Sequence, residues 1–335
     1  MLEEYRAAFE ETAAWWHREN TRPCLVTGRL KRGQLPVKSD ANRFWPGVDS
    51  NPDLDGLLAE FAAGVEKTEG EYAWLPKIPF RFGGRGTAMT IAYYLGGRVL
   101  FGPSTVWVEP VIRNWSDFSV RFDPENPWWQ HTLRYLEKAV ELSRGRFLVC
   151  LPDFGDALTT LALLRGTENL LLDLMDNRSA VIRARDQFLQ LWPEFHRACW
   201  DIYRRHLPGD NSWLLWAPGR TYACQSDFSA MISPELFREL VVPEIEFLGG
   251  YLDYIVWHLD GPEMIKHLDI LLDLPQIKAI QWVHGSGHPS VSHWLPLLKR
   301  IQAKGKSLVL SCTYGAEEKD ILVRELDPVG LYISY

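Results

Sequence analysis

The chain has 335 residues, 46% hydrophobic and 24% charged, which is the balance of an ordinary globular protein with room for a large core. Its net charge of −7 argues against binding to nucleic acid or an anionic membrane, because such binders usually present a basic face. No apolar run reaches the roughly 18 residues of a membrane span, and five widely spaced cysteines without a CxxC pair favour free thiols in the cytoplasm.

The first third of the chain has a loose pattern, and we predict a helical and loop extension plus the first strand over residues 1–95. The acidic, amphipathic start MLEEYRAAFEETAAWW lacks the basic region of a secretory signal and predicts a helix over Glu3–Arg18. Cys24–Thr27 is a strand candidate, and Asp53–Thr68 predicts a second helix. Val106–Ile112 is the next strand candidate.

Helices and short apolar strands alternate in the rest of the chain, which predicts βα units and a parallel sheet. The predicted helices cover Trp128–Ser143, Ala157–Arg165, Ser179–His206, Ser233–Gly249, Pro262–Leu272, Ser292–Lys304 and Ala316–Glu325. The predicted strands begin at Cys24, Val106, Phe147, Thr221, Tyr254, Lys278, Leu308 and Leu331. Eight such strands make a (β/α)8 TIM-type barrel, and we predict one barrel domain over residues 1–335. An open doubly wound sheet is the alternative, although the sequence lacks its usual glycine-rich phosphate loops.

Polar residues follow several predicted strands at their carboxyl ends, where barrel enzymes carry their chemistry. In YIVWHLDG, Tyr254–Gly261, alternation with period two puts His258 and Asp260 on one face of the strand. The other strand ends supply the candidates Asp153, Asp227, Glu109, Arg113, Trp282, His284 and Cys312. The ordinary alternatives are helix capping by the aspartates, a hydrogen-bonded core position for His258 and core packing of Trp282. The joint pattern predicts an active site at the mouth of a barrel.

Four stretches carry a family resemblance: DFGDALTTLALLRGTENLLLDLMD, QSDFSAMISPELFRELVVPEI, VWHLDG and IQWVHGSG. In this order, from about Phe147 to the C-terminus, they resemble the uroporphyrinogen decarboxylase superfamily, and the SPELF-type helix start is the most specific of them. The resemblance implies a TIM-type barrel, in agreement with the strand count. True decarboxylases of the superfamily bind a tetrapyrrole through an arginine-rich RQAGR-type loop. The nearest stretch here, Thr27–Arg32, differs in sequence, which argues against a porphyrin substrate.

The resemblance implies as its preferred chemistry methyl transfer from a small methylated substrate to a corrinoid protein or a thiol such as coenzyme M. Relatives of this kind bind zinc through a His-x-Cys motif and a distant cysteine, and zinc lowers the pKa of the attacking thiol. Here the motif reads His258-Leu259-Asp260. The implied zinc ligands are therefore His258, Asp260 and Cys312, with His284 as a further donor.

Two other functions stay open at this point. Without metal, His258 and Asp260 form an acid/base pair. They would then serve decarboxylation of a small carboxylate or tetrapyrrole, with Arg29 or Arg113 holding the carboxylate. The third is a barrel that binds a small ligand without catalysis. Exposed tryptophans among the 15 in the chain would favour a homodimer.

Overall fold

The computed structural model describes residues 2–34, 53–82, 88–101, 106–312 and 315–335. Its strands are β1 (Cys24–Leu30), β2 (Thr68–Tyr72), β3 (Lys77–Ile78), β4 (Arg98–Phe101), β5 (Val106–Glu109), β6 (Leu148–Val149), β7 (Asp210–Asn211), β8 (Trp216–Ala217), β9 (Thr221–Cys224), β10 (Tyr254–Asp260), β11 (Ile277–Val283), β12 (Ser307–Ser311) and β13 (Leu331–Ser334). Its α-helices are α1 (Arg6–Trp16), α3 (Leu54–Glu66), α4 (Thr90–Tyr94), α5 (Pro127–Ser143), α6 (Ala157–Arg165), α7 (Thr167–Asp176), α8 (Arg178–Tyr203), α9 (Pro234–Leu240), α10 (Val242–Gly249), α11 (Leu268–Asp273), α12 (Leu295–Ala303) and α13 (Ala316–Glu325). Short 3-10 turns cover Leu2–Tyr5, Asp227–Met231, Pro262–His267 and Val291–Trp294.

Parallel strands dominate the fold, as the alternation of strands and helices predicted. Six of them form one sheet in the order β1-β13-β12-β11-β10-β9, and β2 adds an antiparallel edge to β1. β3 and β6 form a second, parallel pair. The ladders between described strands leave openings between β1 and β3 and between β6 and β9. The fold is therefore α/β and consistent with a TIM-type barrel, but closure of the ring is not shown.

The strand predicted at Val106 exists but does not belong to the parallel set. It is β5, which pairs antiparallel with β4 in a separate hairpin. The second parallel strand along the chain is instead β3, whose two residues Lys77 and Ile78 pair with Leu148 and Val149 of β6. A strand of two residues shows no periodicity, so hydrophobic patterning could not reveal it.

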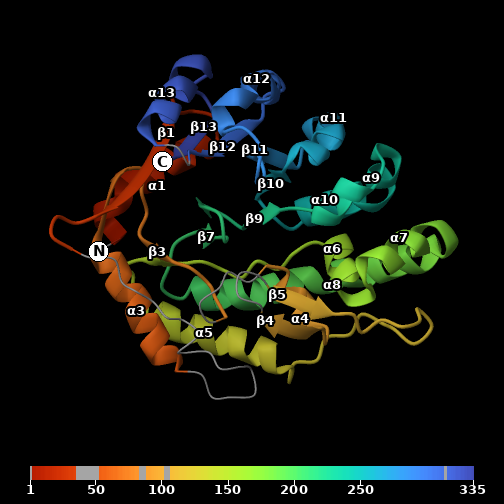
Figure 1. The fold of residues 1–335 in the computed structure, drawn as a ribbon. Helices are drawn as coiled ribbons and strands as arrows, with labels where there is room; N and C mark the ends of the chain where they lie inside the picture. The colour runs from red at the N-terminus through yellow and green to blue at the C-terminus, as the bar shows by residue number, and fades with distance from the viewer. Residues whose placement is uncertain (1, 35–52, 83–87, 102–105, 313–314) are drawn as a thin grey trace.

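The later helices lie along the outer side of the strands that they follow, and α9 to α13 form an arc around β9 to β13 (Figure 1). The helices predicted over Ala157–Arg165 and Ala316–Glu325 begin and end as expected. The helix predicted from Ser233 to Gly249 is divided into α9 and α10 at Val241, just before Pro243. Among the described helices, none has the length and apolar character needed to cross a bilayer.

The inner face of the sheet has its own small core beside the larger one under the outer helices. Strand residues of this inner core include Val256, Ala279 and Val309. Trp15 and Trp16 of α1 join it, and Nε1 of Trp16 donates to the carbonyl oxygen of Trp216 at 3.0 Å. The α1 helix therefore packs at the amino ends of the strands and leaves their carboxyl ends for a site.

The two openings in the ladder are occupied differently. The β7–β8 hairpin fills the opening between β6 and β9, since the Leu151 amide donates to the Asn211 carbonyl at 2.8 Å. On its other side, the Thr221 amide donates to Oδ2 of Asp210 at 2.9 Å. At the second opening, β2 takes the free edge of β1, so β3 cannot pair there. That second opening contains a large cavity.

Candidate active site

The candidate site lies at the carboxyl ends of β6, β9, β10 and β11, the end of a parallel sheet where α/β enzymes bind their substrates. Along β10, Trp257 and Leu259 are buried in the outer core. Val256 belongs to the inner core instead. Because side chains alternate along a strand, His258 and Asp260 share the inward face with Val256, as the sequence predicted.

His258 is held through both ring nitrogens. Its Nδ1 lies 2.6 Å from Oε1 of Gln281, the residue paired with it on β11. Because an amide oxygen only accepts hydrogen bonds, Nδ1 carries a proton and donates it. Its Nε2 lies 3.8 Å from Oδ2 of Asp260, which is the distance of an ion pair rather than of a hydrogen bond. The Trp213 ring stands edge-on to the imidazole, with the ring centroids 5.4 Å apart.

The surroundings of His258 favour its charged form. Burial by itself lowers the pKa of the ring, because it disfavours charge. The contacts with Asp260 and Gln281 and the charge of Asp227 outweigh burial and raise the pKa of His258 above its ordinary value. The ring is therefore more protonated near neutral pH than a free histidine, which suits it to donate a proton.

Replacing Gln281 by leucine is expected to lower the pKa of His258, since Nδ1–H loses its acceptor while the ring stays buried. NMR titration of the histidine ring protons measures this, and the spectrum of His258→Gln assigns the resonance. Gln302→Leu on α12 is the matched control and should leave the titration unchanged. An unchanged pKa in Gln281→Leu would show that this hydrogen bond does not tune the histidine.

Asp153 follows β6 and is held by two residues of the β9 segment. The Tyr222 hydroxyl donates to its Oδ1 at 2.7 Å, and Nε2 of Gln225 donates to its two oxygens at 3.0 and 3.1 Å. Burial raises the pKa of Asp153 to about 6, against the opposing effect of both donors and of His258. A carboxyl group that titrates near neutral pH is typical of sites that bind or exchange protons with substrates.

Two more carboxylates flank His258. The interaction with His258 lowers the pKa of Asp260 against the effect of burial, and His284 contributes in the same direction. Burial raises the pKa of Asp227, with His258 opposing and Asp260 supporting the shift. The structure therefore brings Asp153, Asp227, His258 and Asp260 into one electrostatically coupled cluster, and His284 adjoins it.

Behind this cluster, two carboxyl groups are buried next to the first turn of α6. Oδ2 of Asp156 accepts from the Thr159 amide at 3.0 Å and from the Ser226 hydroxyl at 2.9 Å. Glu244 of α10 accepts from the Ala157 amide, at 3.1 and 3.2 Å for its two oxygens. Burial raises the pKa of Asp156 to about 7, and burial together with the charge of Asp156 raises the pKa of Glu244.

These two groups are expected to make stability fall as the pH rises. In the folded protein Asp156 holds its proton up to about pH 7, and Glu244 also stays protonated above its ordinary range, whereas in the unfolded chain both lose their protons near pH 4. The native state then binds more protons, so the free energy of unfolding decreases between about pH 4 and pH 7. Asp156→Asn keeps the oxygen that caps α6 but cannot ionise, so its free energy of unfolding should decrease less steeply with pH. Urea unfolding at about pH 5 and pH 7 measures both slopes, and equal slopes would contradict the assignment.

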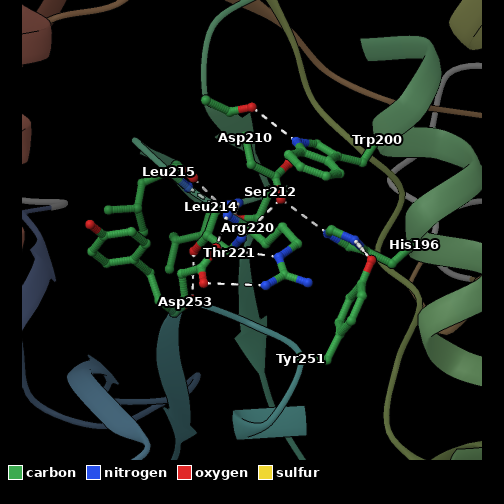
Figure 2. A network of polar contacts seen from close by, with 12 residues as sticks. His196, Trp200, Asp210, Ser212, Leu214, Leu215, Arg220, Thr221, Tyr251 and Asp253 are labelled. Carbon is green, nitrogen blue, oxygen red and sulfur yellow. Dashed lines mark hydrogen bonds and ion pairs between the residues drawn. The ribbon is translucent and has the colours of Figure 1, made fainter. Parts of the chain in front are cut away.

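Trp213 reaches the site from the tip of the β7–β8 hairpin, and a buried polar network holds this hairpin (Figure 2). Nε2 of His196 in α8 lies 3.1 Å from Oδ2 of Asp210, and both side chains are at most 1% exposed. Nδ1 of His196 lies 3.0 Å from the Tyr251 hydroxyl. The same Oδ2 of Asp210 accepts the Thr221 amide. The network ties the hairpin to α8, to β9 and to the segment before β10.

Trp282, a strand-end candidate for the site, does not line it. It is 1% exposed and packs against Trp294, with ring centroids 5.0 Å apart. Because side chains alternate along β11, the inward position belongs to Gln281. Trp282 is therefore a core residue.

The ligands implied for zinc do not come together. Ser311 lines an inner cavity, so the next residue, Cys312, points to the outer side, where Glu318 and Lys319 act on its pKa. His258 and its neighbouring carboxylate face inward. In the described part of the chain, no group of three or more His, Cys, Asp or Glu side chains is placed to hold a metal ion. Since protein zinc sites use at least three such ligands, these residues do not fit zinc.

Three predicted substrate-binding residues from the first half of the chain are engaged elsewhere. Arg29 is 65% exposed and forms a 2.9 Å ion pair with Glu71 of β2. Glu109 pairs with Arg98 across the β4–β5 hairpin at 3.2 Å. Arg113 is exposed, in the segment after β5. The described contacts do not bring them into the cluster around His258.

Residues that the sequence analysis did not assign to the site support its centre: Trp213, Tyr222, Gln225 and Gln281. Alternation along β11 separates Gln281 from Trp282, and the pairing of Gln281 with His258 shows which of the two faces the site. Trp213 lies in the apolar stretch SWLLW, and no local pattern places that stretch against a distant strand.

Comparisons with known proteins support the fold. No protein-family model matches the sequence. No curated protein matches it either. Among solved structures, a methyltransferase from Methanosarcina mazei has a similar fold, with a TM-score of 0.65 and 11% sequence identity. The match covers 98% of this chain and 92% of the other. The chain therefore shares the α/β architecture of that methyltransferase, while membership in the uroporphyrinogen decarboxylase superfamily stays a prediction.

Proposed function

We propose that the chain is an enzyme that transfers a methyl group from a small methylated substrate to a thiol or to the corrinoid of a partner protein. The observation that carries the proposal is the His258 imidazole, with its pKa raised by carboxylates at the carboxyl ends of parallel strands. The shared fold with a methyltransferase and the family resemblance of the sequence support the same reaction.

In the proposed reaction, an electron pair of the acceptor attacks the methyl carbon while the bond from that carbon to a substrate heteroatom breaks. The bonding electrons stay on the heteroatom, which takes a proton from Nε2 of His258. A thiol acceptor reacts as its thiolate, and a corrinoid acceptor would supply the nucleophilic electron pair itself. The products are the methylated acceptor and the demethylated, protonated substrate. General acid catalysis of this kind typically contributes about 10²–10⁴ in rate.

The remaining groups of the cluster have supporting roles in this proposal. Gln281 fixes the ring orientation through Nδ1, so that Nε2 faces the substrate. Asp153, held by Tyr222 and Gln225, accepts a hydrogen bond from an N–H or O–H of the substrate. Three carboxylates around one histidine favour a neutral or cationic methyl donor over an anionic one.

The same charge pattern argues against decarboxylation. That reaction needs a cation to hold the substrate carboxylate beside the proton donor. Arg81 lines the cavity that contains Asp153, but neither of the arginines predicted for this role lies there. Arg29 is paired with acidic residues of β2, and Arg113 is exposed in the segment after β5. The carboxylates near His258 would repel a substrate carboxylate held beside the proton donor.

A direct assay tests the proposal. Purified protein is incubated with ¹³C-methyl-labelled amines, thioethers or methoxy compounds, together with either 2-mercaptoethanesulfonate or reduced free cobalamin. Mass spectrometry then measures label in the acceptor. We expect transfer from at least one class of donor, and we expect His258→Gln to slow it by about 10²–10⁴. Absence of transfer across all donors and both acceptors, or transfer that is unaffected in His258→Gln, would overturn the proposal.

A further inference from the structure

A second and larger cavity lies at the opening between β1 and β3. Its volume is about 870 Å³, within the usual range for small-molecule sites. We call it the seam cavity. It is lined by residues from β1, α3, the segment before β3, the β7–β8 hairpin and β12, among them Gly28, Glu60, Trp74, Asn211, Leu214 and Ser311. The cavity exists because β2 occupies the edge of β1, which keeps β3 from closing the sheet.

The seam cavity has an aromatic wall formed by Trp74. Gly28 and Gly70 face each other across the β1–β2 ladder. A Cβ atom at Gly28 would lie 2.7 Å from Nε1 of Trp74, and one at Gly70 would overlap the indole ring. The two glycines therefore let the indole lie flat on the ladder. Any larger pair of residues would displace the ring.

Two residues that line the seam cavity also carry buried hydrogen-bond acceptors. Asn211 is 0% exposed, and its Nδ2 donates to Sγ of Cys150 at 3.4 Å. Its Oδ1 has no hydrogen-bond partner in the described structure, and neither does the buried Oε2 of Glu60. Buried polar atoms in proteins are nearly always paired, so these two acceptors beside one cavity can accept from a donor group of water or of a ligand.

The seam cavity adjoins the candidate active site. Pro79 and Arg81 line it and also line a smaller cavity of about 450 Å³. The smaller cavity contains Asp153 and Trp213, the second of which contacts His258. The two cavities are therefore adjacent, with Pro79 and Arg81 between them.

We propose that the seam cavity binds an elongated, largely apolar molecule with a ring system and an N–H or O–H donor directed at Asn211 and Glu60. This assignment rests on the proposed function: the molecule is the part of the methyl donor that does not react, and its methyl end lies near Asp153 and His258. The substrate class is accordingly a ring-containing amine, amide or alcohol rather than a one-carbon compound.

A binding experiment tests the cavity without relying on activity. The probe is N-phenyl-1-naphthylamine, an uncharged aromatic molecule with one N–H donor whose fluorescence rises in apolar surroundings. We expect saturable binding of one probe per chain. Ser311→Phe, which fills the cavity, should weaken binding by at least about tenfold. Ser116→Phe, an exposed position outside the cavity, is the matched control and should not change it. Asn211→Leu removes the acceptor and should weaken binding about fivefold.

The outcomes separate the two proposals. Absence of saturable binding to the wild-type protein, or equal binding by folded Ser311→Phe, would overturn the cavity proposal. If Ser311→Phe does not fold by circular dichroism, Ser334→Phe on β13 replaces it, since Ser334 also lines the cavity. Saturable probe binding by a wild-type protein that transfers no methyl group would remove the proposed function alone. Competition between the probe and an active methyl donor would support the link between them.

Discussion

Replacing His258 by glutamine is expected to reduce kcat for methyl transfer by about 10²–10⁴. Glutamine retains a polar group of similar length opposite Gln281, so the β10–β11 ladder should persist. It cannot carry a proton to the leaving heteroatom, because an amide does not titrate near neutral pH. KM should change much less than kcat, since the lost interaction matters most in the transition state. Initial rates at several donor concentrations measure both constants.

The pH dependence of the same reaction gives an independent check on the role of His258. A general acid must be protonated, so the rate should fall as the pH rises through the raised pKa of His258. His293→Gln, at an exposed position outside the cluster, is the matched control and should retain the wild-type rate. If both variants lose the same rate, or if the rate of His258→Gln still falls with rising pH as the wild-type rate does, another group donates the proton.

The sequence predicted the part of the site that strand periodicity controls. The run YIVWHLDG identified an inward-facing histidine and carboxylate at a strand end, and the structure places both there. On the next strand the same rule puts Gln281 and Trp282 on opposite faces without saying which face is inward. The pairing of Gln281 with His258 decides this, and that pairing is a tertiary contact.

Other parts of the fold depend on contacts that no local pattern contains. β3 has two residues and is defined by its partner β6. The β7–β8 hairpin is inserted where a ladder between β6 and β9 would otherwise close, and it is held by a histidine from α8 and an amide from β9. Val106–Glu109 has the composition of a barrel strand, yet pairing with β4 makes it part of a separate hairpin. Tertiary context thus overrides strand propensity at each of these places.

Removal of the Asp210 carboxylate is expected to lower the free energy of unfolding by about 3 kcal/mol. In Asp210→Ala the Thr221 amide loses its acceptor and Nε2 of His196 loses the group 3.1 Å away, while both stay buried. Leaving buried polar groups without partners accounts for most of the loss. Asp210→Asn keeps one acceptor oxygen for the amide and should lose less. Urea unfolding monitored by circular dichroism measures all three proteins.

The consequence of Asp210→Ala for the site follows from the position of the hairpin. Asp210 and Asn211 begin the hairpin whose tip carries Trp213 against His258, so a loosened base should let the Trp213 ring move and lower kcat even where the protein stays folded. Asp201→Ala, which breaks only an exposed ion pair with Arg204, is the control and should change stability by less than about 1 kcal/mol. If Asp210→Ala proves as stable and as active as this control, the buried network is dispensable, and the hairpin must be held by its other contacts, among them the hydrogen bonds from the Leu151 amide and from Trp16 of α1.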